Sequence, residues 1–94
     1  MKIFSYFTNL IPRIKSIKPY PAYNLLIEFT NGTQKQYDMN SLINTNKMYE
    51  PLNDLTLFNS VVVDSGGYGV SWNDDIDMSE HELWTNGIEM PPNK

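Results

Sequence analysis

Alternating apolar and polar positions in the first half of the chain predict a β-hairpin. The apolar residues of its first strand occupy every second position and so share one face of a sheet: Tyr23, Leu25, Ile27 and Phe29. Asn31-Gly32 follows and favours a tight turn, because both residues tolerate a positive φ. A return strand over residues 33–38 completes the hairpin.

The register of this hairpin has two solutions. With a two-residue turn, Glu28 faces Lys35 and Leu26 faces Tyr37. With a type I turn and a bulge, Leu25 faces Tyr37 instead. Pairing of opposite charges across the strands favours the first register. The return strand carries polar residues in either case, so it is expected at a sheet edge or with one wet face.

The segment before the hairpin is a further expected strand, over residues 13–18. Ile14 and Ile17 are three positions apart, so either the strand carries a bulge or only one of them faces the core. Pro19-Tyr20-Pro21 is expected to end this ladder in a turn.

A second hairpin is expected in the other half of the chain. Val61-Val62-Val63 is a β-branched run typical of a strand, and Ser65-Gly66-Gly67 supplies a turn. The return strand over residues 68–72 places Tyr68, Val70 and Trp72 on one face. Gly69 lies on the other face, where a neighbouring backbone can approach closely.

Short helices are expected between and after the hairpins. Residues 39–43 favour one helical turn. Asn53 or Asp54 can cap a helix whose apolar face carries Leu52, Leu55 and Phe58. Ser79 and Glu82 have the spacing of a capping box, and that helix is expected to stop at Gly87.

Together these elements predict one α+β domain over residues 12–87, a small antiparallel β-sheet of hairpins with two short helices. Residues 1–11 form an N-terminal extension, for which the sequence leaves a short helix or a loose arm open. Residues 88–94 are expected to be a frayed tail.

The order of these landmarks resembles the bacterial family of domains of unknown function DUF2442. The likeness covers residues 12–87 and rests on Asn31-Gly32 after Leu25–Phe29, then Tyr37-Asp38, Tyr49-Glu50-Pro51-Leu52, Val70-Ser71-Trp72-Asn73 and Ile76-Asp77. The resemblance implies an α+β fold and no established activity. It also implies a partner for some members, which are encoded beside a second small protein of family DUF4160 in an arrangement similar to toxin–antitoxin pairs.

Composition narrows the possible functions. The chain has no cysteine, which excludes disulfides and thiolate chemistry. Its net charge is −4, with no concentrated basic face, so nucleic-acid binding is not expected. No leader or membrane-spanning segment is predicted, and a cytoplasmic location is expected.

Candidate catalytic and metal-binding groups are sparse. Asn73, Asp75 and Asp77 copy the opening of a calcium loop, but Met78 stands where that loop needs glycine. His81 is the only histidine. We therefore expect no catalytic residue, no metal, no cofactor and no small-molecule substrate.

Aromatic residues remain as candidates for contacts with another protein. The chain has six Tyr and two Trp, many for so small a core. The residues singled out are Tyr20, Tyr23, Tyr68 and Trp72. The sequence thus favours a protein-binding module that pairs with a partner or with itself through a free sheet edge or an aromatic patch.

Two alternatives stay open. One is an acidic inhibitor that mimics nucleic acid, because residues 50–89 contain no Lys or Arg. The other is a small metal-dependent hydrolase that uses Asp74, Asp75, Asp77 and His81.

Overall fold

The structure is a computed structural model that describes residues 11–91. The expected N-terminal extension lies, apart from Ile11, outside the described residues. The elements are β1 (Ile14–Tyr20), β2 (Asn24–Phe29), β3 (Gln34–Asp38), α1 (Asn40–Thr45), η2 (Glu50–Asn53), α2 (Leu55–Phe58), β4 (Val62–Val63), η3 (Ser65–Gly67), β5 (Gly69–Ser71), β6 (Asp77–Ser79), α3 (Glu80–Asn86) and β7 (Ile88–Glu89).

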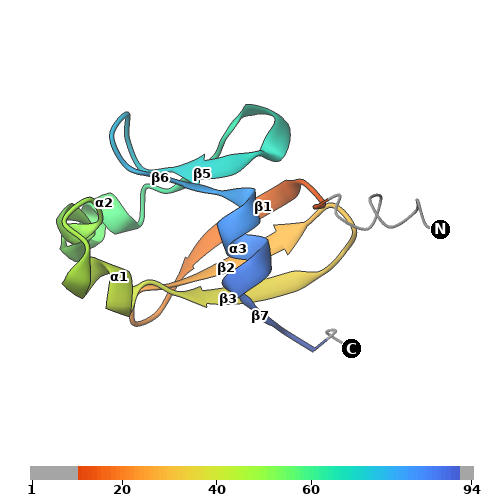
Figure 1. The fold of residues 1–94 in the computed structure, drawn as a ribbon, viewed down its shortest axis with the longest axis horizontal. Helices are drawn as coiled ribbons and strands as arrows, with labels where there is room; N and C mark the ends of the chain where they lie inside the picture. The colour runs from red at the N-terminus through yellow and green to blue at the C-terminus, as the bar shows by residue number, and fades with distance from the viewer. Residues whose placement is uncertain (1–10, 92–94) are drawn as a thin grey trace.

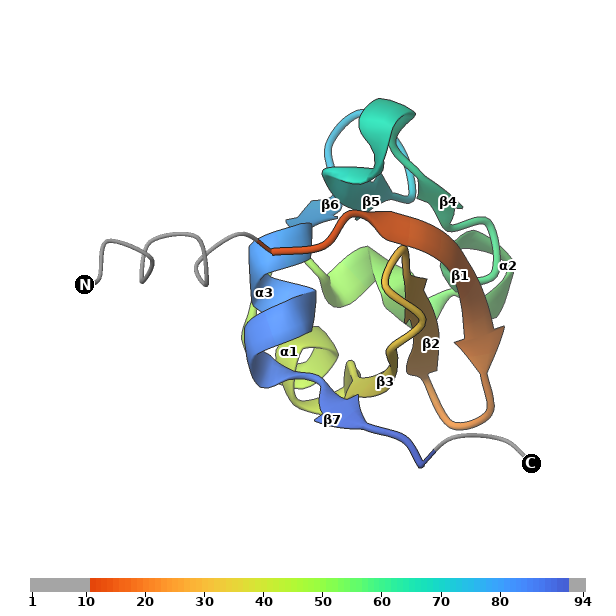
Figure 2. The ribbon, with the colours of Figure 1, turned by 90° about the vertical axis from the view of Figure 1, so that its right-hand side faces the viewer.

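The strands form two antiparallel sheets, which confirms the expected α+β class. One sheet has four strands in the order β1-β2-β3-β7, and the other has three in the order β4-β5-β6. Helix α3 lies across the front of the four-stranded sheet, beside the smaller sheet (Figure 1). The four-stranded sheet curves around one side of the core, and α1, α3 and the second sheet close the rest (Figure 2).

Strand β1 is an edge strand with a bulge. Its register shifts between Ile14 and Ser16, which confirms the bulge and turns Ile14 and Ile17 inward. The ladder ends within Pro19-Tyr20-Pro21 as expected, although Pro19 and Tyr20 still belong to β1 and the turn begins at Pro21. An edge strand tolerates proline because one side of its backbone needs no partner strand.

The hairpin of β2 and β3 adopts the bulged register, so the register favoured by charge pairing is wrong. Leu25 lies opposite Tyr37. Phe29 N donates to Thr33 O, and Gly32 N donates to Phe29 O, both at 2.9 Å. A one-residue slip moves every side chain to the other face of a sheet. Burial of Tyr37 therefore outweighs the charge pair.

Strand β7 corrects two expectations at once. Ile88 pairs with Gln36, Glu89 pairs with Lys35, and Met90 N donates to Gln34 O at 2.8 Å. Residues 88–90 are therefore not frayed. Of the two alternatives for β3, the sheet edge is excluded because β3 is an interior strand, and the partly exposed Gln34 and Gln36 agree with the other. The outward N–H and C=O groups of β3 need partners, and the chain that leaves α3 supplies them.

The smaller sheet matches its prediction except at its ends. Val70 and Trp72 are both buried, but Tyr68 does not share their face, because it precedes β5 in helical backbone and is exposed. A Cβ added at Gly69 would lie 2.7 Å from Met78 O, which confirms the expected close approach. The approaching strand is β6, which the sequence pattern did not predict.

The helix caps follow the sequence closely. The Asp54 carboxylate accepts from Thr56 N at 3.0 Å, and Ser79 Oγ accepts from Glu82 N at 3.1 Å. The expected return contact of Glu82 is replaced. Its Oε2 accepts from Tyr37 Oη at 2.6 Å and from Asn86 Nδ2 at 3.0 Å. Glu82 thus ties α3 to β3.

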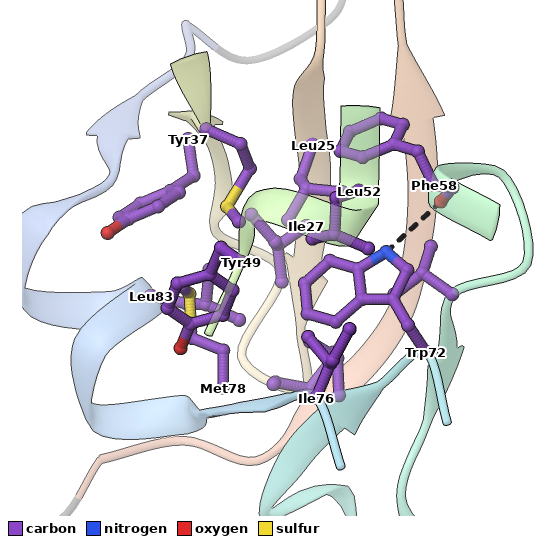
Figure 3. Packing of buried hydrophobic residues seen from close by; sticks show 14 of the residues in the cluster. Leu25, Ile27, Tyr37, Tyr49, Leu52, Phe58, Trp72, Ile76, Met78 and Leu83 are labelled. Atoms are coloured by element: carbon purple, nitrogen blue, oxygen red, sulfur yellow. Dashed lines mark hydrogen bonds between the residues drawn. The ribbon is translucent and has the colours of Figure 1, made fainter. Parts of the chain in front are cut away.

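One core joins the two sheets and the helices. Trp72 lies at its centre, where the indole N–H donates to Phe58 O at 3.1 Å (Figure 3). The rings of Tyr49 and Trp72 meet edge to face, with centroids 6.4 Å apart. Leu25 and Ile27 of β2 face this cluster and are fully buried. Between residues 11 and 91, no helix is long and apolar enough to cross a membrane.

The loop geometry at Gly32 can be tested by substitution. Gly32 has φ 91°, and nothing lies within 4 Å of an added Cβ. Gly32→Ala should therefore lower the free energy of unfolding by about 1–2 kcal/mol, because alanine is strained in left-handed backbone. Gly32→Asn should lose less, since asparagine tolerates this conformation better. Urea denaturation would measure both, and an alanine variant as stable as the wild type would contradict this loop geometry.

Alkaline pH should destabilise the fold through Tyr37. Burial, then the hydrogen bond and charge of Glu82, raise the pKa of Tyr37 well above its usual value, and burial raises the pKa of Tyr49. Unfolded tyrosines ionise near pH 10, so above about pH 10 the unfolded chain releases protons that the folded protein keeps. The free energy of unfolding is therefore highest below that pH and falls as pH rises further.

Tyr37→Phe is the matching variant. It should be less stable than the wild type near pH 8, because the bond to Glu82 is lost, yet lose less stability between about pH 8 and pH 11. Urea unfolding followed by tryptophan fluorescence would give both differences. An equal alkaline loss in the two proteins would count against the raised pKa of Tyr37.

Candidate contact surface

The four aromatic candidates divide into exposed and buried residues. Tyr20 is 40% exposed and Tyr68 is 58% exposed. Trp72 is only 6% exposed, so its selection as a contact residue is corrected: its ring packs in the core. Tyr23 is half-buried and holds the fold together, with Oη donating to Asn53 O at 2.7 Å.

Tyr20 lies in a shallow groove between the β1–β2 turn and α2. We call it the Tyr20 groove; its volume is about 340 Å³ and its lining is Pro19, Tyr20, Pro21, Ala22, Tyr23, Leu55 and Asn59. The lining contains no carboxylate and no basic side chain.

Leu55 was missed as a candidate, because its spacing from Leu52 and Phe58 suggested one buried helix face. It is instead 55% exposed. The chain leaves η2 in extended backbone at Asp54, so η2 and α2 are separate helices and Leu55 does not continue the buried face. The sequence around Leu55 carries no signal of this exposure.

The turn that forms one wall of the groove is strained and firmly anchored. Ala22 and Tyr23 have φ 66° and 63°, a left-handed conformation that costs about 1–2 kcal/mol at each non-glycine residue. Asn40 Nδ2 donates to Ala22 O at 2.6 Å, and Met39 N donates to Tyr23 O at 3.0 Å. Strain that its surroundings hold in place is a feature of functional sites. The wall of the groove is therefore preformed.

Tyr68 forms a second exposed position, held from two sides. The Arg13 guanidinium carbon lies 4.0 Å from the ring centroid, and a Cβ added at Gly66 would lie 2.8 Å from the ring. Arg13 Nη1 also donates to the Glu80 carboxylate at 2.9 Å, and this ion pair compensates the buried charge of Glu80. The ring of Tyr68 is therefore exposed but held in place by Arg13.

The sheet edges are poor templates for an added strand. In the four-stranded sheet, the edge strand β1 carries a bulge, two lysines and Pro19. The opposite edge, β7, has two residues. Bulges, lysines, proline and short length are the usual means by which edges avoid pairing with another chain. Contacts through side chains are therefore favoured over strand addition.

The acidic candidates do not form a metal centre. Asn73 Oδ1 accepts from Asp75 N at 2.8 Å and from Ile76 N at 2.9 Å, so this segment is a turn closed by its own side chain. From residue 11 to residue 91, no group of three or more His, Asp or Glu side chains could hold a metal ion. Asp74, Asp75, Asp77 and His81 are all exposed, and Asp77 lines a pocket that the other three do not line.

Comparison with known proteins gives one match. Residues 14–89 match the family described as Protein of unknown function (DUF2442). No curated protein and no solved structure matches the chain. Because the matched residues span the two sheets and the helices between them, the chain belongs to the DUF2442 family.

Proposed function

We propose that this protein is a small non-catalytic protein-binding module whose contact surface is the Tyr20 groove. The observation that carries the proposal is the exposure of Tyr20 and Leu55 around a preformed groove. The strained turn accepts a hydrogen bond from Asn40 of α1 and donates one to Asn53 of η2, and these bonds keep the groove open without a ligand.

The chemistry of the groove supports a protein as its ligand. Tyrosine is enriched at interface hot spots, because a rigid ring buries a large area at a low cost in side-chain entropy. Tyr20 and Leu55 are apolar anchors, and Asn59 adds an amide that can bond a peptide backbone. With one histidine and no cysteine, the chain has few groups for chemical catalysis.

The family suggests which partner to test first. The resemblance implies that some members are encoded beside a second small protein. We therefore expect the partner to be the product of a neighbouring gene in the same cytoplasm. Self-association through the same groove is the competing outcome.

Paired substitutions in and outside the groove test the proposal. Tyr20→Ala and Leu55→Ser remove the two anchors, and each should weaken the complex with the neighbouring gene product by about 2 kcal/mol, roughly 30-fold in Kd. Co-expression with that protein, followed by affinity purification and calorimetry, would measure the loss.

The matched control is Ile88→Ser, which removes a large exposed side chain from β7. It should leave the affinity unchanged. Equal binding by all three variants would reject the groove as the contact surface. A wild-type protein that stays monomeric by light scattering and retains no neighbouring gene product would reject the module itself.

A further inference from the structure

A second pocket, distinct from the Tyr20 groove, opens where α1, β6 and α3 meet. Its volume is about 370 Å³ and its lining is Leu42, Met48, Tyr49, Asp77, Met78, Ser79 and Glu82. We call it the Glu82 pocket. Leu42, Met48, Tyr49 and Met78 make an apolar wall, and the only ionised groups in the lining are the carboxylates of Asp77 and Glu82.

Contacts with the core hold the side chain of Glu82 and the backbone of Asp77. Glu82 Oε2 accepts from Tyr37 Oη at 2.6 Å, and this bond crosses from β3 to α3. The Asp77 carbonyl accepts from Tyr49 Oη at 2.9 Å, which holds the backbone from which the Asp77 carboxylate extends. The negative charge therefore sits at a defined place beside the apolar wall.

Three of the five cations in residues 11–91 are engaged elsewhere, and the other two, Lys18 and Lys47, do not line the Glu82 pocket. Among the described residues, the ion pairs join Arg13 to Glu80 and Lys15 to Glu28. Lys35, the other cation near α3, donates to the Trp84 carbonyl and lies 4.1 Å from the Trp84 ring centroid. The lining of the Glu82 pocket itself contains no lysine or arginine. After burial, Glu82 contributes to the raised pKa of Tyr37, and the negative charges of Asp77 and Glu82 contribute to the raised pKa of Tyr49.

We propose that the Glu82 pocket binds the side chain of a lysine or arginine from a partner protein. A basic side chain has an apolar stem and a charged head, and it buries the stem along apolar surface while the head keeps polar contacts. Leu42, Met48 and Met78 match the stem. The carboxylates of Glu82 and Asp77 match the head through charge-assisted hydrogen bonds.

Other ligand classes fit the pocket less well. An anion would meet two carboxylates with no compensating cation in the lining. A purely apolar side chain would have to desolvate those carboxylates without pairing them. Met48 at the rim is exposed and flexible, and it can adjust to either basic side chain.

Nuclear magnetic resonance titration of the full chain tests this site with a single-residue probe. N-acetyl-arginine N-methylamide should produce saturable shifts of the backbone amides of Met48, Met78, Ser79 and Glu82, with Kd on the order of 1–10 mM. The uncharged probe N-acetyl-norleucine N-methylamide keeps an aliphatic stem but lacks the charged head, and it should not produce these shifts. Glu82→Gln keeps an acceptor for Tyr37 but removes the charge, and it should weaken arginine binding about tenfold.

Asp75→Asn is the matched control, because it removes one negative charge from the exposed turn outside the pocket lining. It should change the affinity by less than about twofold, since charges exposed to solvent are screened. Equal loss in both variants, equal shifts with norleucine, or no saturable shift would each overturn the proposal. Tyr20→Ala should bind the arginine probe like the wild type. The proposal for the Glu82 pocket and the proposal for the Tyr20 groove can therefore fail independently.

Discussion

The burial of one face of β2 and β3 is the constraint on which the rest of the structure depends. Leu25 and Ile27 of β2 are fully buried, Tyr37 of β3 is 8% exposed on the same face, and burying a large apolar side chain contributes about 1.5–3 kcal/mol. A cross-strand charge pair contributes at most about 1 kcal/mol. The hairpin therefore takes the register that places Tyr37 inside, although this separates Glu28 from Lys35.

That register decides how α3 attaches to the sheet. With Tyr37 inside, its hydroxyl reaches Glu82 of α3, and the chain beyond Gly87 runs alongside β3 as β7. Glu82 is thereby held at the edge of the Glu82 pocket. Core packing sets the register of β2 and β3 in the first half of the chain. That register in turn fixes the position of the Glu82 carboxylate in the second half.

The acidic character of the chain is distributed unevenly by the fold. Arg13 neutralises the buried Glu80, whereas Glu82 is bonded only by neutral donors. The Tyr20 groove contains no carboxylate at all. The protein therefore presents two surfaces of different chemistry, an uncharged aromatic groove and an acidic pocket, on different elements of the fold.

The faces of the strands and the helix caps of this protein could be predicted from short sequence patterns. Alternation gave the inward faces of β2 and β5, Asp54 and Ser79 gave the caps, and Gly69 marked a close backbone approach. These features depend on residues a few positions apart, so short patterns suffice to predict them. Tertiary structure alone decided the hairpin register, the pairing of β7, the burial of Trp72 and the exposure of Leu55. Each of these depends on which distant segment packs against the residue, and local sequence patterns do not contain that information.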